Sequence, residues 1–378
     1  MKLKFFSIVA AVMLLSGCKS AITLTVVNDY NIVRDSEMIE VDTQSITSRF
    51  GAIFVITDNA GNEVPYQITH DGKLIFQTTL PEFTKRQYKI CKGVPTPVDT
   101  TCTAFFRPDC QDDVAWENDH GGYRLYGPQY KHGGGKVYGY DIWCKSVTKP
   151  VVSKFYDNHH HNLSYHIDHG EGFDGYTVGP TLGAGMSALL DSHKNIYYPC
   201  AYNKYEILDN GPLRTTIKFV IDPFVIDGDT VTETRIITLD KGAWLNRATV
   251  SFANLSTEKS IVSGIVIHND NTDYILDRDN ALMAYADLSD NLSAGNGEIY
   301  VGVIGEKCDS MVFRHINPSV ANACGQILLY NTYNPDTRLR YYWGSAWSKG
   351  GVKSREDWLE IMRDTAAKLR SPLTVKLK

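Results

Sequence analysis

Short runs of alternating or β-branched apolar residues, separated by turn residues, occupy the first quarter of this chain. The strands that this pattern predicts are residues 22–27, 52–58, 64–69 and 74–77. Two hairpin turns, Asn59–Asn62 and His70–Lys73, separate the last three of these strands. Strands and turns at this spacing are typical of a small β-sandwich or barrel, which we place in residues 18–98. We expect the following residues, 99–113, to be a linker.

The pattern remains that of β-strands beyond residue 114, although glycines interrupt it. The clearest strands are residues 214–222, 229–239, 245–253 and 261–268. A hairpin turn at Asp227–Gly228 is predicted between the first two of them. We therefore expect residues 114–378 to form a second, larger β-sandwich unit.

One segment near the end of the chain has a convincing helical pattern. Ser354 is a suitable N-cap, apolar residues recur at helical spacing from Trp358 to Leu369, and Pro372 ends the pattern. The predicted fold class is therefore all-β, with a small N-terminal β-sandwich or barrel, a large sandwich and one C-terminal helix.

The first residues have the composition of a bacterial export signal. Lys2 and Lys4 precede an apolar run that is too short for a transmembrane anchor, and Leu15–Cys18 reads as a lipobox. We expect residues 1–17 to be a lipoprotein signal peptide and the Cys18 thiol to be acylated, although an ordinary secretory signal is the alternative. The absence of an acidic run after Cys18 favours the periplasmic side over the cell surface.

Composition narrows the range of partners. The chain has 378 residues and a net charge of −5, which argues against nucleic acid or an anionic membrane as a partner of the whole surface, so membrane contact is expected through the lipid anchor only. Export places the other cysteines in an oxidising compartment, where Cys102 could pair with Cys110 and Cys308 with Cys324. Nucleotide-binding, zincin and α/β-hydrolase motifs are missing from the sequence.

Histidines and carboxylates crowd most closely at Tyr165–Glu171. If this segment is extended, His166 and Asp168 share one face, and His169 and Glu171 share the other. If Gly170 breaks the strand, all four side chains could converge at the mouth of a loop. Either pair could serve as an imidazole base oriented by a carboxylate. The alternatives are a divalent metal site, with His166 and Asp168 as ligands, and a polar loop with locally satisfied hydrogen bonds. The nearby His159–His161 is expected to be a solvated loop.

Aromatic residues and arginines precede this segment. Rings that stack on sugar faces are a common use of exposed aromatics, although each ring could instead belong to the core. The aromatic candidates are Trp116, Tyr123, Tyr126, Tyr138, Tyr140 and Trp143. Arg124 and Arg214 could each offer a bidentate fork to the carboxylate of a uronic acid. Arg235 and Arg247 are expected to pair with Glu233 or Asp240.

The chain resembles the family of exported bacterial proteins called domain of unknown function 4861. The segments that carry the resemblance are Trp116–His120, Tyr123–Pro128, Gly139–Lys145, Tyr165–Glu171, Val178–Pro180, Asp209–Arg214, Leu239–Arg247 and Tyr342–Ser348. The resemblance implies a galactose-mutarotase-like super-sandwich for the large unit and an association with pectin-degrading enzymes. Residues 21–98 resemble the small β domain that precedes some rhamnogalacturonan lyases.

From these residues we expect a carbohydrate-active enzyme that acts on uronate-containing, pectin-like oligosaccharides by β-elimination. His166 or His169 would be the base, Asp168 would orient a histidine, Tyr126 would be the acid, and Arg124 or Arg214 would hold the carboxylate. Glu171 and Asp119 are further candidates for these catalytic roles. The remaining substrate contacts are expected from Trp116, Asp119, Tyr140 and Trp143.

Three alternatives remain at this point. A glycoside hydrolase or a sugar epimerase could use the same carboxylates, and a non-catalytic lipoprotein could use the same aromatic residues to bind glycans. No cofactor is required by the leading hypothesis, and a divalent metal in place of the arginine is a variant of it.

Overall fold

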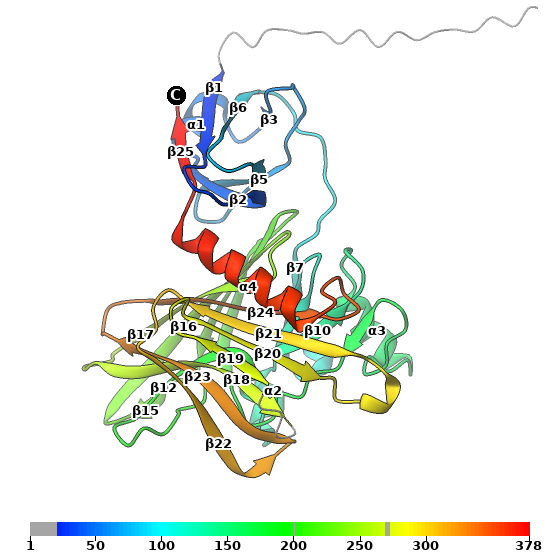
Figure 1. Cartoon of the computed structure of the whole chain (residues 1–378), viewed down its shortest axis with the longest axis vertical. Coiled ribbons are helices and arrows are strands. Elements are labelled where there is room, and N and C mark those ends of the chain that lie inside the picture. The colour runs from blue at the N-terminus through cyan, green and yellow to red at the C-terminus, as the bar shows by residue number, and fades with distance from the viewer. Residues whose placement is uncertain (1–20, 200, 269–272) are drawn as a thin grey trace, which may run out of the picture.

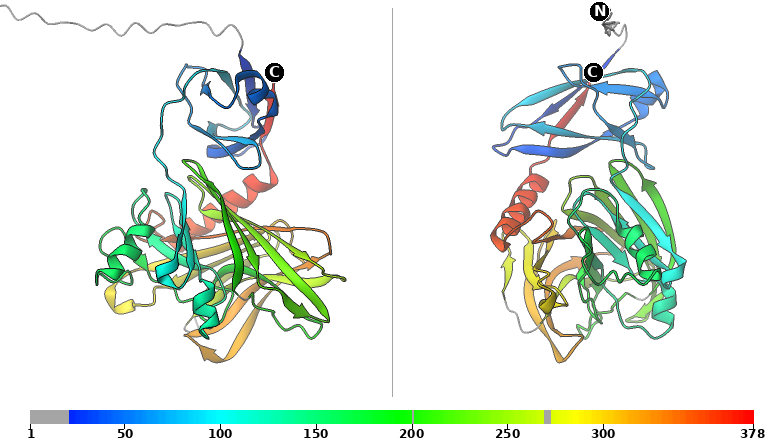
Figure 2. Two further views of the ribbon diagram at one scale, coloured as in Figure 1. Left: turned by 180° about the vertical axis from the view of Figure 1, so that it is seen from behind. Right: turned by 90° about the vertical axis from the view of Figure 1, so that its right-hand side faces the viewer.

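The computed structural model describes residues 21–199, 201–268 and 273–378, and these form two β units stacked one above the other (Figure 1). The predicted signal peptide, the proposed acylation site Cys18, and Cys200 lie outside the described residues. The fold is all-β, as predicted, and the long helix at the C-terminal end lies between the two units (Figure 2). No helix among the described residues is long and apolar enough to span a membrane.

The smaller unit is a sandwich of two sheets. The first sheet has the order β25-β1-β6-β3 and the second has the order β2-β5-β4. Their strands are β1 (Ile22–Val27), β2 (Arg34–Asp42), β3 (Phe54–Thr57), β4 (Tyr66–Ile68), β5 (Lys73–Leu80), β6 (Lys85–Lys92) and β25 (Thr374–Leu377), and the short helix α1 is Gln44–Phe50. Alternate residues of β1 are buried, so its apolar side chains face the opposite sheet and form the core.

The final strand corrects the predicted limit of the large unit. Strand β25 pairs with β1, with Leu377 opposite Leu24, so residues 374–377 belong to the first sheet of the small unit. This pairing satisfies backbone groups at an edge of that sheet. Residues 103–107 are a second correction, because they form β7 of the large unit within the segment predicted to be a linker.

The larger unit contains the remaining three sheets, which share one hydrophobic core. A nine-stranded sheet contains β13 (Tyr202–Asn210), β14 (Arg214–Ile221), β16 (Asp229–Asp240), β17 (Leu245–Ala253), β24 (Leu339–Trp347), β21 (Glu298–Gly305), β20 (Leu282–Leu288) and β19 (Tyr274–Asp277) in that order, with β15 (Phe224–Ile226) paired to β16. A four-stranded sheet contains β12 (Ala184–Leu189), β18 (Lys259–His268), β23 (Ala323–Tyr333) and β22 (Ser310–Val320). The clearest predicted strands are thereby confirmed as β14, β16, β17 and β18. The turn at Asp227–Gly228 joins β15 to β16, whereas it was predicted to follow the first of those strands directly.

The third sheet of the large unit carries the segment in which the site was predicted. Its strands are β11 (Gly172–Asp174), β10 (Asp141–Lys145), β9 (Gly122–Leu125), β8 (Asp113–Glu117) and β7 (Thr103–Arg107), in that order. The short helices α2 (Pro128–His132) and α3 (Val152–His160) lie in the connections of this sheet.

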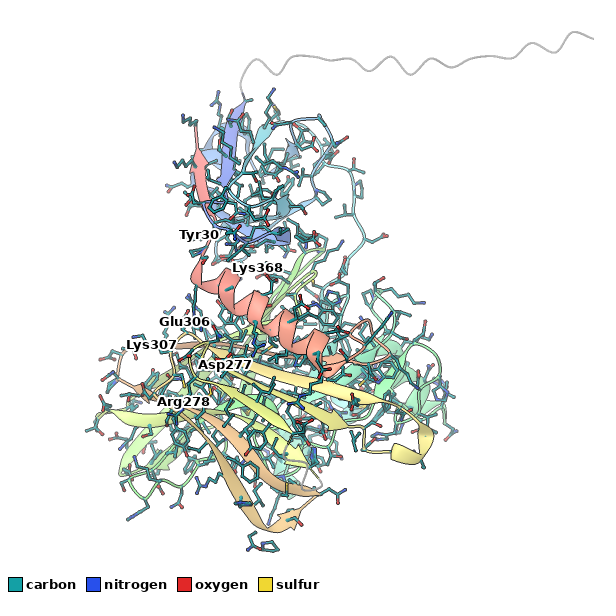
Figure 3. All side chains as sticks on the ribbon, in the orientation of Figure 1. Tyr30, Asp277, Arg278, Glu306, Lys307 and Lys368 are labelled. Carbon is teal, nitrogen blue, oxygen red and sulfur yellow. The ribbon has the colours of Figure 1, made fainter. Side chains whose placement is uncertain are left out.

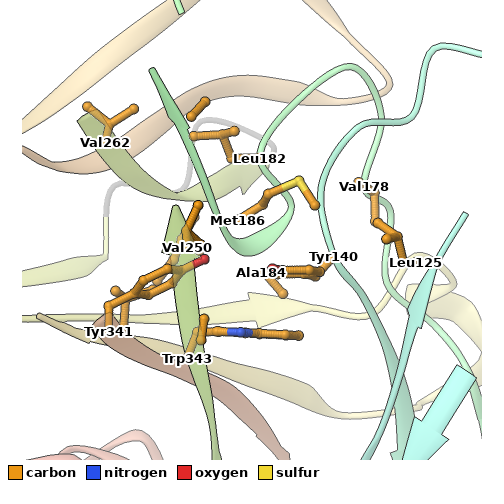
Figure 4. Close-up of a cluster of buried hydrophobic side chains, with 14 of the residues drawn as sticks. Leu125, Tyr140, Val178, Leu182, Ala184, Met186, Val250, Val262, Tyr341 and Trp343 are labelled. Atoms are coloured by element: carbon orange, nitrogen blue, oxygen red, sulfur yellow. The ribbon is translucent and has the colours of Figure 1, made fainter. Parts of the chain in front are cut away.

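Large aromatic side chains fill the space between the sheets. The ring of Tyr140 stacks on that of Trp343 with 4.0 Å between centroids (Figure 4). The indole of Trp116 lies edge-on to Trp343. Offset and edge-on aromatic pairs add to the stabilisation that burial of their area provides. These rings therefore hold the segment around Tyr140 against the nine-stranded sheet.

The predicted C-terminal helix is confirmed as α4 (Arg355–Arg370). Its N-cap Ser354 accepts a hydrogen bond from the backbone N–H of Asp357, and Trp358, Met362 and Ala366 are buried against the nine-stranded sheet. Arg363 on the exposed side of the helix lies 3.8 Å from the carboxylate of Asp277, which is labelled in Figure 3. The helix therefore covers this sheet and leads the chain back to the small unit.

Polar contacts tie the two units together at their junction. The Arg214 side chain of β14 pairs with Glu40 of β2 and with Asp240 of β16. His70 of the small unit contacts Asp209 of β13 at 2.7 Å. These contacts place Arg214 at the junction of the units.

Candidate functional site

Arg124 on β9 lies at the centre of a buried cluster of three aspartates. Asp141 stands directly opposite it on β10, and their closest contacts include Nε to Oδ2 at 2.9 Å. The guanidinium also lies 2.8 Å from Asp174 on β11 and 3.7 Å from Asp113 on β8. Four adjacent strands thus direct one cation and three carboxyl groups to a single buried place, where each charge needs a partner.

Aromatic side chains surround the guanidinium of Arg124. Its Cζ atom lies 4.4 Å from the ring centroid of Tyr126 and 4.9 Å from that of Trp143. The Tyr126 hydroxyl donates to Asp141 at 2.7 Å and accepts from Arg124 at 2.9 Å. This tyrosine is therefore already fully engaged with the cluster.

Burial changes the acidity of the aspartates. It raises the pKa of Asp174 to about 7 and that of Asp113 to about 6, while the positive charge of Arg124 opposes both shifts. Removal of the carboxylates from water outweighs the attraction to one guanidinium that they share. Burial therefore favours the protonated, neutral form of these two carboxyl groups, and a carboxyl group shifted in this way is a candidate for acid or base chemistry.

His166 lies beside the cluster with 53% of its side chain exposed. Its Nδ1 atom is 3.2 Å from the backbone oxygen of Asp174 and 3.7 Å from the carboxylate of the same residue. An Nδ1–H that donates to this oxygen leaves Nε2 as the nitrogen with the lone pair. The imidazole is thus held by the backbone of Asp174, with the carboxylate of the same residue nearby, while it remains accessible to solvent.

Three further side chains lie around His166. The ring of Tyr165 is 4.6 Å from the imidazole between centroids, and His159 stacks on Tyr165 at 4.1 Å and lies 6.4 Å from the imidazole. Burial raises the pKa of the Asp290 carboxyl group, and the charge of His166 opposes this rise. Because His166 acts on its pKa, the Asp290 carboxyl group belongs to the surroundings of the imidazole. We define the Arg124 site as Arg124, Asp113, Asp141, Asp174, Tyr126, Tyr165, His166 and Asp290.

The structure separates the other residues predicted beside His166. Tyr165–Glu171 forms turns instead of the extended segment that would place pairs on shared faces, and Gly170 has a φ of +96°. Asp168 accepts from the backbone N–H groups of Gly170 and Gly172, so it orients the loop and no histidine. The predicted orienting role therefore belongs by geometry to Asp174.

His169 and Glu171 also have local partners. The Nε2 atom of His169 lies 3.0 Å from the backbone oxygen of Ser164. The carboxylate of Glu171 pairs with Lys149 at 2.8 Å and with Lys154. Both side chains therefore stabilise the loop that presents His166.

The predicted aromatic surface for sugar stacking is wrong for its largest members. Trp116, Tyr140 and Trp143 are fully buried and pack within the core. The indole N–H of Trp116 donates to Asn246 at 2.8 Å, which satisfies its polar atom in the interior. Because no face of these rings meets solvent, they cannot stack on a sugar.

Two polar residues predicted to bind substrate lie elsewhere. Asp119 accepts from the backbone N–H of Gly242 at 2.8 Å, and Arg214 is the buried junction residue described above. The expected partner of Arg235 is confirmed as Glu233, but Arg247 pairs with Glu40 because Asp240 is occupied by Arg214. Arg124 is present in the site, yet its three carboxyl partners leave no free fork for a substrate carboxylate.

The three successive histidines were expected in a loop, but the structure places them at the end of a helix. His159 and His160 end helix α3, and His161 is its C-cap. The helix forms because Val152, Phe155 and Tyr156 recur at helical spacing and are buried. His159 thereby comes into contact with Tyr165 of the Arg124 site.

One group of described residues has metal-ligand spacing. Asp109, Cys110 and His160 each place one ligand atom within 4.8 Å of the others. The Asp109 carboxylate is already bound by Arg107 at 2.6 Å, whose charge disfavours a cation. His166 and Asp168, the ligands suggested by the sequence, form no such group within the described part of the chain.

Four of the cysteines bear on the disulfides that the sequence suggested. Cys102, Cys110, Cys144 and Cys308 are free thiols, so neither of the two suggested disulfides forms.

A second histidine–carboxylate pair lies in the large unit. His268 contacts Asp287 at 2.7 Å through Nδ1, but both residues are buried. This is the kind of pair that the sequence placed at His166 and Asp168.

Sequence reasoning missed Asp113, Asp141, Asp174 and Asp290 as site residues. A usable signal was available for two of them, because Asp141 and Asp174 each directly adjoin apolar residues at one end of a buried strand. A charged residue at such a position must be paired when the strand is buried on both faces.

Comparisons with known proteins show the family to which this chain belongs. Residues 26–375 match the model of a family described as Domain of unknown function (DUF4861). A relative, Uncharacterized protein P7 of Formosa agariphila, is 25% identical over 403 residues, which cover 98% of each chain.

Two solved structures from Enterococcus faecalis are similar in fold. An alpha-mannosidase of strain V583 has a TM-score of 0.50 at 8% identity, covering 95% of this chain and 46% of that one. A protein in the Glycosyl Hydrolase Family 38 has a TM-score of 0.48 at 9% identity, with 95% and 47% covered. The chain spans about half the length of these solved structures. At this identity the likeness to the alpha-mannosidase shows the fold alone.

Proposed function

Since this chain belongs to the domain of unknown function 4861 family and carries the Arg124 site, we propose that it is a carbohydrate-active enzyme acting on uronate-containing, pectin-like oligosaccharides by β-elimination. The observation that carries this proposal is the accessible imidazole of His166 held against Asp174, a carboxyl group whose pKa is about 7. The fold is similar to that of an alpha-mannosidase, which supports a carbohydrate as the substrate.

β-Elimination begins with removal of the proton on the carbon beside the uronate carboxylate. His166 Nε2 takes this proton, and Asp174 stabilises the imidazolium that forms. The electrons of the broken C–H bond form a carbon–carbon double bond as the bond to the leaving glycosidic oxygen breaks. The imidazolium returns the proton to that oxygen, so a single histidine serves as base and then as acid.

Arg124 and Tyr126 have supporting roles in this mechanism. Arg124 fixes Asp174 and Asp141 by charge-assisted hydrogen bonds, and the Tyr126 hydroxyl fixes Asp141. We therefore assign both as positioning residues, in place of the clamp and acid roles that the sequence suggested. No cofactor enters the proposed reaction.

Glycoside hydrolysis is the second candidate, and one observation favours it. Asp113 and Asp174 are two carboxyl groups in one cluster with pKa values of about 6 and about 7, a pairing of the kind that hydrolases use as acid and base. Hydrolysis also needs no cation for a uronate carboxylate. Product analysis on defined pectic oligosaccharides separates the two reactions, because elimination creates a conjugated double bond that absorbs ultraviolet light.

Location is a further part of the proposal. We place the protein on the periplasmic side, anchored by acylation of Cys18, because the sequence preceding that cysteine matches a lipobox. The first described strand, β1, starts at Ile22, four residues after Cys18. A lipid on Cys18 would therefore hold the small unit close to the membrane surface.

A further inference from the structure

A pocket of about 340 Å³ in the large unit is lined in part by residues of the edge strand β22 and its neighbour β23. Strand β22 lies at the end of the molecule away from the small unit (Figure 1). Its polar lining comprises Asn195, Tyr198, Arg314, His315, Asn317 and Gln326, and two isoleucines complete it. The lining contains one arginine and one histidine but no aspartate or glutamate. In a chain with a net charge of −5, such a pocket is a local site for an anion.

Arg314 offers a guanidinium that is open to a ligand, whereas the guanidinium of Arg124 is not. Its side chain is half-buried, and Nη1 donates to the backbone oxygen of Lys194 at 3.0 Å. No carboxylate among the described residues pairs with it, whereas Arg124 contacts three. The Lys194 contact steadies the guanidinium and leaves Nε and Nη2 available as a planar fork for a ligand carboxylate.

A fixed aromatic ring lies in the same pocket. The Tyr198 hydroxyl accepts from the Gln326 side chain at 2.8 Å, and the oxygen of this buried amide in turn accepts from the backbone N–H of Leu182 at 2.8 Å. The ring stacks on Tyr138 with 5.2 Å between centroids. A ring held at both its edge and its face is preorganised to pack against a pyranose.

We propose that this pocket binds a sugar unit that carries a carboxylate, with Arg314 holding the carboxylate and Tyr198 packing against the ring of the sugar. This inference rests on the proposed function, since it assumes a uronate-containing ligand. Tyr138, which backs Tyr198, is three residues before Asp141 of the Arg124 site, a span of at most roughly 11 Å of chain. The pocket is therefore assigned as a binding site of the large unit for acidic sugars, connected to the Arg124 site through this short stretch of chain.

Calorimetric titration with monosaccharides tests the pocket apart from any reaction, because a monosaccharide has no glycosidic bond to break. We expect D-galacturonate to bind the full chain and D-galactose to bind at least 10-fold more weakly. Arg314→Gln should raise the Kd for galacturonate about 10- to 100-fold, as loss of a charge-assisted hydrogen-bonded pair does, and leave that for galactose unchanged. Arg314→Lys should fall between, because it keeps the charge and loses the fork.

The matched control is Arg340→Gln on β24, because Arg340 is 51% exposed and pairs with Glu306 outside the pocket. Its Kd for galacturonate should equal that of the parent protein. Thermal unfolding of each variant verifies that the protein is folded. An unchanged Kd in folded Arg314→Gln, or no binding of galacturonate to the parent protein, would overturn the assignment.

Galactose 6-sulfate distinguishes the two sources of a sugar-borne anion. If it binds more tightly than galacturonate, the pocket is a sulfate-ester site and the carboxylate assignment is wrong. Failure of the pocket and failure of the proposed reaction also remain distinct. Turnover of oligogalacturonides with galacturonate binding that does not depend on Arg314 overturns only the pocket, and Arg314-dependent binding without any product overturns only the reaction.

Discussion

His166 Nδ1 lies 3.7 Å from the carboxylate of Asp174, and this contact joins a solvent-accessible imidazole to a buried acid. Asp174 is in turn fixed by Arg124 at 2.8 Å. The arrangement places the imidazole of His166, a proton acceptor, at the surface and the carboxyl group of Asp174, which can also carry a proton, directly behind it.

Removal of the imidazole should abolish turnover without unfolding the protein. His166→Ala is expected to lower kcat on oligogalacturonides by about 10²- to 10⁴-fold, the usual contribution of a general acid–base group. His169→Ala is the matched control, because His169 is also exposed and bonds only to the backbone of Ser164. Its kcat should change less than about twofold. Equal losses in the two variants would place the reacting base elsewhere in the loop.

Stability should decline as pH rises towards neutrality. The pKa of Asp174 is about 7 in the folded protein and near 3.8 in the unfolded chain, so the folded state binds more protons between these values. The free energy of unfolding therefore falls as pH increases through this window. Denaturant unfolding at a series of pH values measures the slope, which Asp174→Asn should make shallower.

Asp168→Asn serves as the control for this pH series, because the Asp168 carboxylate caps a loop and lies outside the aspartate cluster. Asp113 contributes to the decline in the same direction, since its pKa is about 6. The slope should thus be reduced but not removed in Asp174→Asn. A slope as steep as that of the parent protein would show that Asp174 does not hold the proton.

Arg214 should matter for stability and not for turnover. Because Arg214 is buried and pairs with Asp240 and Glu40, Arg214→Ala leaves carboxylates without their partner at the junction of the units. We expect a loss of about 3–5 kcal/mol in the free energy of unfolding. The exposed pair of Arg340 with Glu306 provides the comparison, and Arg340→Ala should cost less than about 1 kcal/mol. A large fall in kcat/KM of folded Arg214→Ala would instead restore its suggested role as a carboxylate clamp.

Gly139 should not tolerate a side chain. A Cβ atom there would lie 2.1 Å from the carbonyl carbon of Leu182 and 2.2 Å from the backbone nitrogen of Gly183, neither of which can rotate away. Gly139→Ala is therefore expected to cost about 1–3 kcal/mol or more and to displace the neighbouring Asp141. Gly133→Ala is the control in the same connection, where the nearest atom is 3.1 Å away. Thermal unfolding of both variants checks the difference.

Membrane association should depend on one thiol. Cys18→Ala removes the proposed acylation site, and the protein should then move from the membrane fraction to the soluble periplasmic fraction. Cys308→Ala controls for the loss of a thiol as such, because Cys308 is a free cysteine of the large unit. Membrane association that persists in Cys18→Ala would exclude a lipid anchor at this position.

Local patterns were sufficient to predict the strands with the clearest apolar runs, such as β14, β16, β17 and β18, and the long C-terminal helix. Helix α4 could be predicted because its N-cap, its apolar spacing and Pro372 all lie within one segment. Strand β25 has an equally clear pattern, but its partner β1 lies at the other end of the chain. Only the register between distant strands decides which sheet a short strand joins, and this information is not local.

The sequence indicated only part of the group of residues that surrounds Arg124. His166, Arg124 and Tyr126 were singled out because they crowd together in sequence, whereas Asp174 and Asp113 become neighbours of Arg124 only through the order of strands β8 to β11. Trp116 and Tyr140 were misassigned because an aromatic strand residue has the same pattern whether it faces a sugar or the core. Burial is thus what separates structural aromatics from functional ones.

The most direct test is the ultraviolet absorbance of a defined oligogalacturonide during incubation with the full chain and with His166→Ala. We predict that absorbance from a conjugated double bond rises with the parent protein and stays at background with the variant. New reducing ends from the parent protein without this absorbance would contradict elimination.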